Sequence, residues 1–195
     1  MNPRRLLAPI AAALLLAGCK DAPAPGAAPT QAAATTAVSV EAIARDGQGF
    51  SVGSTMSART MYVFFDPQCP HCAALWQAAR PLKSQARFVW LPVGLINESS
   101  TLQGAALLAA ADPATAMDQH EASLRAQKGG ILPSGGGDAQ KEAVRKNTEL
   151  MTRMGFASVP TVVGLHAQSG QLVTIEGSVA TAVLAQRLGL QAPGG

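Results

Sequence analysis

Cysteine, net charge and long apolar runs are all scarce in this chain of 195 residues. Three cysteines cannot supply the four ligands of a structural zinc site, and His120 and His166 lack the paired spacing that could complete one, so we expect no bound metal. The formal net charge of +3 is not gathered in a basic stripe, which argues against nucleic-acid binding. The longest apolar run, Leu6 to Ala17, is too short to cross a bilayer as a stable helix.

That apolar run has the position and flanking residues of an export signal. Arg4 and Arg5 precede it, and Leu16-Ala17-Gly18-Cys19 places small residues directly before a cysteine. This pattern resembles the bacterial lipoprotein signal, in which the cysteine becomes the lipidated first residue. We therefore predict that residues 1–18 are removed and that Cys19 is lipidated; an ordinary secretory signal with a chance cysteine is the alternative. Removal of residues 1–18 lowers the formal charge to 13 − 12 = +1.

A segment with almost no large apolar residue follows, from Lys20 to about Ala37. It is rich in alanine, proline and threonine, a composition typical of disordered or extended linkers. We interpret residues 19–37 as a tether that joins the lipid anchor to a folded domain of residues 38–195. Lys20 after the lipid cysteine resembles the outer-membrane sorting pattern. We therefore expect a protein anchored at the periplasmic face of the cell envelope, with the outer membrane favoured.

The folded part contains one Cys-x-x-Cys pair, Cys69 and Cys72, between a strand-like apolar run and a helical pattern. A thiol at a helix N-terminus lies among unpaired N–H groups and the positive end of the helix dipole, which favour the thiolate. The second sulfur lies about one turn away, within reach of a disulfide. A purely structural disulfide is the alternative, but a bridge across two residues stabilises little. We predict a redox-active dithiol with Cys69 as the exposed attacking sulfur and Cys72 as the inner resolving sulfur.

The order of apolar patterns predicts an α/β fold. Asp138 is expected to N-cap a helix that Gly155 ends, and glycines 47, 49 and 53 interrupt the chain after its first expected strand. Without the helices of about residues 98–155, the order β-α-β-β-β-α is that of a thioredoxin-like fold, so that segment is an α-helical insertion. Strands are expected at 38–43, 61–65, 87–93, 161–165 and 172–175, and helices at 70–81, twice within 98–127, at 138–154 and at 179–188.

Several stretches around the cysteines carry a resemblance to a known family. They are Phe65-Asp66-Pro67-Gln68-Cys69-Pro70-His71-Cys72, Trp76-Gln77-Ala78-Ala79-Arg80-Pro81, Leu91-Pro92-Val93-Gly94 and Val159-Pro160. Together they resemble the catalytic domain of the periplasmic DsbC/DsbG family, most of all its DsbG branch, over roughly residues 60–190. The resemblance implies an exported thiol–disulfide reductase or isomerase that acts on cell-envelope proteins. It also implies a membrane redox partner and no cofactor beyond the Cys69–Cys72 disulfide.

The resemblance assigns roles to individual residues. Cys69 matches the family's nucleophile and Cys72 its resolving cysteine, and Pro70 and His71 match the dipeptide that tunes the pair. Pro160 matches the cis-proline that faces the disulfide.

The resemblance also assigns a role to Val159, whereas Asp66, His120 and His166 are interpreted from the sequence itself. In such folds the backbone of Val159 pairs with an extended client peptide. Asp66 is open to two interpretations, a helix-entry residue or an acid that handles protons near Cys72. His120 is expected at the surface of an insertion helix, and His166 at the end of a strand.

Three departures from the family pattern leave alternatives open. About 20 residues from Val38 stand where the family has a dimerisation domain and linker helix, so we expect a monomer. His71 and Val159 match the oxidase DsbA rather than the isomerases, and an imidazole beside the thiolate makes a disulfide more oxidising. A DsbA-like disulfide-donating oxidase is therefore one alternative to a reductase or isomerase. A non-catalytic client-binding lipoprotein is another.

Overall fold

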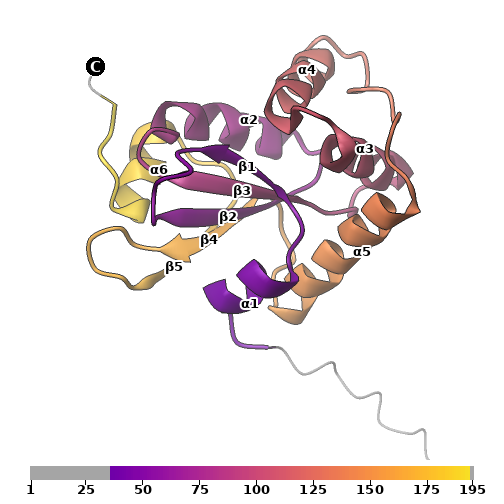
Figure 1. The fold of residues 1–195 in the computed structure, drawn as a ribbon. Helices are drawn as coiled ribbons and strands as arrows, with labels where there is room; N and C mark the ends of the chain where they lie inside the picture. Colours follow the sequence, from indigo (N-terminus) through magenta and orange to yellow (C-terminus); the bar gives the residue numbers. More distant parts are fainter. Residues whose placement is uncertain (1–35, 194–195) are drawn as a thin grey trace, which may run out of the picture. The chain divides into compact units, whose positions relative to one another are not determined.

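A five-stranded mixed sheet is the centre of the molecule (Figure 1). The computed structural model describes residues 36–193; Cys19, the predicted signal and almost all of the predicted tether lie outside the described residues. The strand order is β1-β3-β2-β4-β5, with β2 parallel to β3 and every other neighbouring pair antiparallel. The strands are β1 (Phe50–Gly53), β2 (Thr60–Phe65), β3 (Arg87–Pro92), β4 (Thr161–Leu165) and β5 (Leu172–Glu176).

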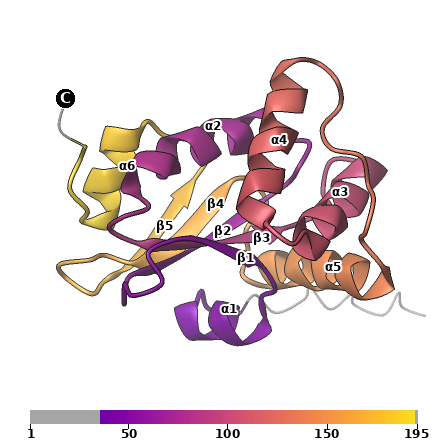
Figure 2. The ribbon, with the colours of Figure 1, turned by 45° about the horizontal axis from the view of Figure 1, so that its top comes forward.

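Helices cover both faces of this sheet (Figure 2). Helices α2 (Pro70–Ala79) and α6 (Thr181–Leu188) lie on one face, whereas α1 (Val40–Asp46) and α5 (Asp138–Arg153) lie on the other. Helices α3 (Glu98–Ala109) and α4 (Pro113–Arg125) lie beside the ends of β2 and β3, and the 3-10 turn η1 (Arg80–Leu82) follows α2. No helix within residues 36–193 combines the length and apolarity that crossing a membrane requires.

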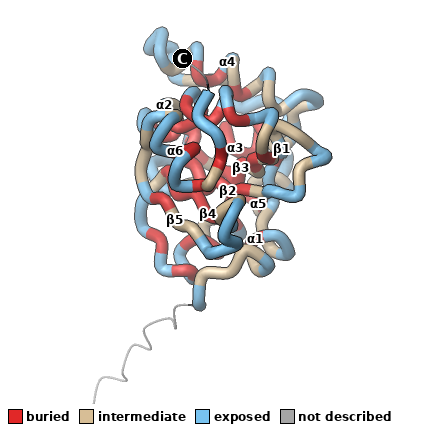
Figure 3. Tube along the Cα trace, turned by 90° about the vertical axis from the view of Figure 1, so that its left-hand side faces the viewer, coloured by how far each residue is buried: buried red, intermediate tan, exposed pale blue. Residues whose placement is uncertain are grey.

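The central strand β2 is buried on both of its faces. Met61, Val63 and Phe65 belong to the apolar cluster beneath α2 and α6, and Tyr62 and Phe64 to the cluster beneath α1 and α5. In Figure 3 the middle strands β2, β3 and β4 are coloured mostly as buried, whereas the edge strand β5 is mostly intermediate or exposed. A strand with side chains buried on both sides needs a continuous apolar sequence, which is the pattern read at residues 61–65.

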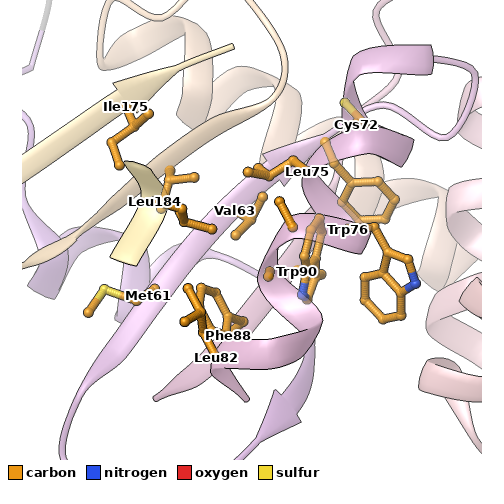
Figure 4. Packing of buried hydrophobic residues seen from close by; sticks show 14 of the residues in the cluster. Met61, Val63, Cys72, Leu75, Trp76, Leu82, Phe88, Trp90, Ile175 and Leu184 are labelled. Atoms are coloured by element: carbon orange, nitrogen blue, oxygen red, sulfur yellow. The ribbon is translucent and has the colours of Figure 1, made fainter. Parts of the chain in front are cut away.

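Aromatic rings fix α2 against the sheet. The ring centroid of Trp76 on α2 lies 4.9 Å from that of Trp90 on β3, and Trp90 lies 5.6 Å from Phe65. Phe50 on β1 packs edge-on against Phe65 at 6.1 Å. Figure 4 shows Trp76 and Trp90 in this cluster with Cys72 and Leu75 nearby. Edge-on aromatic pairs add about 0.5–1.5 kcal/mol to their area burial, so the helix that carries the cysteines is firmly seated.

A buried amide on α5 joins three parts of the chain. The Oδ1 atom of Asn147 accepts from the backbone N–H of Gln48 at 2.9 Å, and its Nδ2 donates to the carbonyls of Gln48 and Pro92 at 2.7 and 3.0 Å. Asn147 is fully buried. These bonds satisfy the backbone groups of Gln48, just before β1, and the buried carbonyl of Pro92 at the end of β3.

The structure confirms the predicted α/β thioredoxin-like fold with a helical insertion, here α3 to α5, and corrects three details. The predicted strand at 38–43 is helix α1, because Ser39 is its N-cap and accepts from the N–H of Ala42. Strand β1 was not predicted, because three glycines surround it. Asp138 is the first residue of α5 rather than its N-cap, which is Gly137. Gly155 follows the helix at φ 81°, as predicted.

Candidate active site

The two cysteines lie where β2 ends and α2 begins. The N–H of Cys69 donates to the carbonyl of Asp66 at 3.0 Å, which closes the turn between strand and helix. Cys69 is the N-cap, with φ −93° and ψ 116°, and Pro70 is the first helical residue. Proline there costs no hydrogen bond and has a φ already suited to the helix. The turn therefore places the Cys69 sulfur at the positive end of α2.

The two sulfurs have opposite acidities. The pKa of Cys69 is lowered to about 6, first by the hydrogen bond from the Cys72 thiol and then by the backbone N–H groups of Cys72 and His71. The pKa of Cys72 is raised far above its usual range, first by burial and then by its thiol donating to Cys69. At neutral pH, Cys69 is therefore a thiolate and Cys72 a thiol.

The expected exposure of Cys69 needs correction. Its exposed fraction is 6 %, against 1 % for Cys72, so both residues are buried and Cys69 is only the outer of the two. The cover is the loop before β4: the Sγ atom of Cys69 lies 3.6 Å from the carbonyl oxygen of Val159. The Val159–Pro160 peptide bond is cis, as predicted. The structure thus brings Cys69, Cys72, Val159 and Pro160 together at one site.

Asp66 has a structural task that accounts for its burial. Its Oδ1 accepts from the N–H of Gln68 at 2.8 Å, and its Oδ2 accepts from the N–H groups of Leu95 and Ile96 at 2.8 and 3.0 Å. A carboxylate with three backbone donors is a strong acceptor and is stable when buried. The structure therefore supports the helix-entry interpretation, and the same carboxylate joins the cysteine turn to the loop after β3.

His71 is exposed on the first turn of α2, next to the buried pair. Its imidazole lowers the pKa of Cys69 through Coulomb attraction, the last of the causes of that shift. Pro70 is exposed beside it. Both residues of the dipeptide therefore face solvent, and His71 adjusts the thiolate without being its main stabiliser.

His120 on α4 is buried, which overturns its expected place at the surface. Its Nδ1 accepts from the N–H of Ile131 at 3.2 Å, so its Nε2 donates to the carbonyl of Pro67 at 2.7 Å. Burial lowers the pKa of His120 and keeps the ring neutral. His120 therefore fastens α4 and the following loop to the cysteine turn. His166 follows the last residue of β4, as predicted.

Glu121, which follows His120, is a site residue that the sequence did not reveal. Its exposed fraction is 1 %, and its Oε2 atom has no hydrogen-bond partner in the part of the chain that the structure describes. Its pKa is raised to about 7, first by burial and to a smaller extent by the negative charge of Cys69. No motif spacing links residue 121 to residue 69, because the two meet only through the packing of α4 on the start of α2.

Comparison with known proteins places this arrangement in a family. The family model described as a thioredoxin-like domain matches residues 54–192. The chain belongs to this family. Among solved structures, the thioredoxin-like domain resembles the catalytic domain of Proteus mirabilis ScsC, with a TM-score of 0.60 and 18% identity over 76% of this chain and 92% of that one. Pseudomonas aeruginosa DsbA2 matches with a TM-score of 0.59 and 17% identity over 71% and 91% of the two chains.

Curated relatives of this thioredoxin-like chain are more similar in sequence. The thiol:disulfide interchange protein DsbG of Pseudomonas aeruginosa is 37% identical over 145 residues, which are 70% of this chain and 54% of the relative. DsbG of Escherichia coli is 36% identical over 104 residues, 52% and 42% of the two chains. The chain thus spans about half the length of the curated relatives it matches, and the resemblance to the DsbG branch is confirmed.

Proposed function

We propose that this protein is a thiol:disulfide oxidoreductase that exchanges disulfides with other proteins through Cys69 and Cys72. The observation that carries the proposal is the opposite acidity of two adjacent sulfurs: the pKa of Cys69 is lowered to about 6, and that of Cys72 is raised. Exchange needs a thiolate to attack or leave and a second sulfur to resolve the mixed disulfide. A bridge kept only for stability has no need of such a difference.

The exchange follows from the order of the sulfurs. In the reducing direction, the Cys69 thiolate attacks a client disulfide and forms a mixed disulfide, and one client sulfur leaves as a thiolate. Cys72 then loses its proton and attacks the Cys69 sulfur, which closes the Cys69–Cys72 disulfide and releases the second client thiolate. The oxidising direction is the reverse. The carbonyl of Val159, 3.6 Å from the Cys69 sulfur, lies where an extended client backbone can pair beside it.

Net donation of disulfides is a second candidate, favoured by the low pKa of Cys69. A stabilised thiolate stabilises the reduced enzyme, which makes its disulfide a stronger oxidant. His71 adds to this effect and, like Val159, matches the oxidase pattern rather than the isomerase pattern. A measured reduction potential distinguishes the two directions, because an oxidase lies well above the potential of thioredoxin, about −270 mV.

Trapping tests the division of roles. Cys72→Ser leaves Cys69 free to attack, so we expect persistent mixed disulfides with client proteins. Cys69→Ser retains only the deeper sulfur with the raised pKa, so we expect almost no trapped client. Non-reducing gels with identification of the trapped proteins measure both. Equal trapping by the two variants would contradict the roles assigned to Cys69 and Cys72, and no trapping by either would favour the non-catalytic alternative.

The proposed clients are exported proteins, and the proposed place is the periplasmic face of the cell envelope. Two curated relatives are thiol:disulfide interchange proteins, and one structural neighbour is a periplasmic thioredoxin-like protein of Salmonella enterica. The residues before Cys19 support lipid anchoring. Cys19→Ala should abolish acylation and release a protein that keeps its exchange activity. Wild-type protein recovered without lipid from membrane-free extracts would contradict the anchor. The electrons pass to or from a membrane redox partner.

We also propose a monomer. Residues 40–53 stand before the matched domain, and they are used within it: Ile43 of α1 packs beneath the sheet and β1 pairs with β3. Residues 40–53 therefore serve the core and sheet of this domain rather than a separate dimer interface, which usually buries about 800 Å2 per partner. Sedimentation and a scrambled-ribonuclease assay test this. We expect a monomer that exchanges disulfides in one step but repairs scrambled clients poorly, and a tight dimer with strong isomerase activity would overturn it.

A further inference from the structure

The buried face of α4 brings an acidic side chain to the thiols. Met117, on this face, belongs to the same apolar cluster as Cys69 and Cys72. His120 donates to the carbonyl of Pro67, two residues before Cys69. Glu121 lies next to His120 and one turn after Met117, so it shares the side of α4 that packs on the cysteine turn.

Glu121 has no structural partner that explains its burial. Its Oε2 atom accepts no hydrogen bond from any described residue, and its side chain is almost wholly removed from solvent. Asp66, in contrast, satisfies its carboxylate with three N–H groups. A buried, unpartnered carboxyl is costly to keep ionised, so it readily holds a proton. Such a group beside a thiolate changes its protonation when the thiolate appears or disappears.

The charges around Glu121 come from two helices and the following loop. On α4, Asp118 raises its pKa and the exposed Arg125 lowers it, and from the start of α2 the Cys69 thiolate raises it. His71 is exposed and acts on Cys69.

Two other nearby groups do not change with the redox state of the pair. His120 is kept neutral by its burial. Lys128, in the loop after α4, is exposed. The Cys69 thiolate is therefore the member of this set whose charge is removed when Cys69 and Cys72 form a disulfide.

We infer that Glu121 is the proton-storing residue of the disulfide exchange, which takes up a proton when the Cys69–Cys72 disulfide is reduced and releases it when the disulfide forms again. This inference rests on the proposed exchange activity. When a client dithiol reduces the disulfide, the client loses two protons and two electrons. Cys72 takes one proton as its thiol, Cys69 remains a thiolate, and the Glu121 carboxylate takes the other. Atoms and charge balance, and the buried site keeps one negative charge in both states.

The coupling makes the direction of exchange depend on pH. The reduced enzyme binds more protons than it would with Cys72 alone, so acid favours the reduced form and strengthens the disulfide as an oxidant. Coupling is also reciprocal: if reduction raises the pKa of Glu121, then ionisation of Glu121 raises the pKa of Cys69 by the same amount. Glu121 affects the reacting sulfur of Cys69 through its charge and forms no bond to the client. It is therefore a positioning residue rather than a catalytic one.

Carboxyl NMR of the wild-type protein tests this without any substitution. With 13C-labelled glutamate side chains, we expect one carboxyl to titrate at a clearly higher pH in the reduced than in the oxidised protein. Glu121→Gln should remove that signal, which assigns it. Identical titration of every glutamate in both redox states would overturn the inference. If the pair fails to form a reversible disulfide with a small dithiol, the proposed function fails instead.

Proton counting gives a second measurement. Reduction of the wild-type disulfide by a small dithiol near pH 7 should take up more protons per disulfide than reduction of Glu121→Gln, by about 0.3 proton. Thiolate absorbance should show a lower Cys69 pKa in Glu121→Gln than in wild type. Glu149→Gln, an exposed glutamate on α5, is the matched control and should leave both values unchanged. Equal counts and equal Cys69 pKa values in wild type and Glu121→Gln would also overturn the inference.

Discussion

Two regions of the molecule meet at the thiols, and they differ in how their residues find one another. The turn from β2 to α2 places Asp66, Cys69 and Cys72 within seven residues of the chain. Helix α4 brings His120 and Glu121 from about 50 residues away. The turn holds the reacting sulfurs, whereas α4 packs in the same apolar cluster and adds titratable groups. Chemistry that depends on local spacing is visible in a sequence, but chemistry supplied by packing is not.

The largest stability effect is expected on the turn itself. Asp66→Asn removes a charged acceptor and points an amide NH2 group toward backbone donors, so it should lower the free energy of unfolding by about 4 kcal/mol. Denaturant unfolding measures the loss. Asp138→Asn, a fully exposed carboxylate on α5, is the control and should cost less than about 1 kcal/mol. A cost near that of the control would show that Asp66 is no structural anchor and would reopen its role as a proton-handling acid.

A somewhat smaller effect is expected from α4. His120→Ala leaves the buried carbonyl of Pro67 and the N–H of Ile131 unpaired, at a cost of about 3 kcal/mol. Cys69→Ser and Cys72→Ser act on the chemistry itself, whereas His120→Ala should leave both sulfurs able to exchange. His166→Ala, which loses one exposed hydrogen bond, is the matched control and should cost less than about 1 kcal/mol. If His120→Ala were as mild as this control, α4 would not be fastened to the turn through His120.

The pH dependence of the same variant sharpens the comparison. Burial lowers the pKa of folded His120, so below about pH 6.5 the unfolded chain binds a proton that the folded chain does not. Wild type therefore loses this contribution to stability as the pH falls through about 6.5, and His120→Ala has none to lose. The difference in the free energy of unfolding between wild type and His120→Ala should therefore become smaller from pH 7 to pH 5. A constant difference would mean that folding does not lower the pKa of His120.

The smallest effect is expected at the exposed dipeptide. His71→Tyr removes a weak Coulomb attraction, so the pKa of Cys69 should rise by less than about one unit, and the disulfide should become slightly less oxidising. Thiolate absorbance and a glutathione redox titration measure the two quantities. A rise of several units would make His71, rather than the Cys72 thiol and the helix N–H groups, the main stabiliser of the thiolate.

Most of the fold could be predicted because the residues within or next to each helix and strand carry signals of its type and its ends. The apolar run at 61–65, the start of a helix at Pro70 and the stop at Gly155 all follow from side-chain periodicity or backbone preference. The prediction of a strand at 38–43 was wrong because alternation over only six residues also fits one and a half turns of helix. The N-cap of Ser39 favours the helix. Strand β1 was missed because Gly49 suggested a turn. Glycine is needed there because the backbone of β3 lies close by: a Cβ on residue 49 would lie 2.4 Å from the Trp90 carbonyl oxygen.

The candidate site divides in the same way. Cys69, Cys72 and Pro160 were predicted because a motif or a family resemblance marks them. The burial of Cys69 was not predicted, because the Val159 carbonyl that covers it lies 90 residues further along the chain. His120 was misplaced since an isolated histidine on an amphipathic helix carries no sign of the face on which it lies. Only the packing of α4 reveals that it is an anchor and that its neighbour Glu121 lies by the thiolate.

Asn147 joins parts of the chain that are synthesised at different times. A chain that emerges from its N-terminus presents Gln48 early, whereas the amide that bonds both its backbone groups appears 99 residues later. Until α5 has formed, water must satisfy those groups, and the segment before β2 has only part of its final support. Strand β4, which pairs with β2, and the Val159 carbonyl, which covers Cys69, come later still in the chain. The N-terminal segment therefore gains its bonds to Asn147 only once α5 has been made.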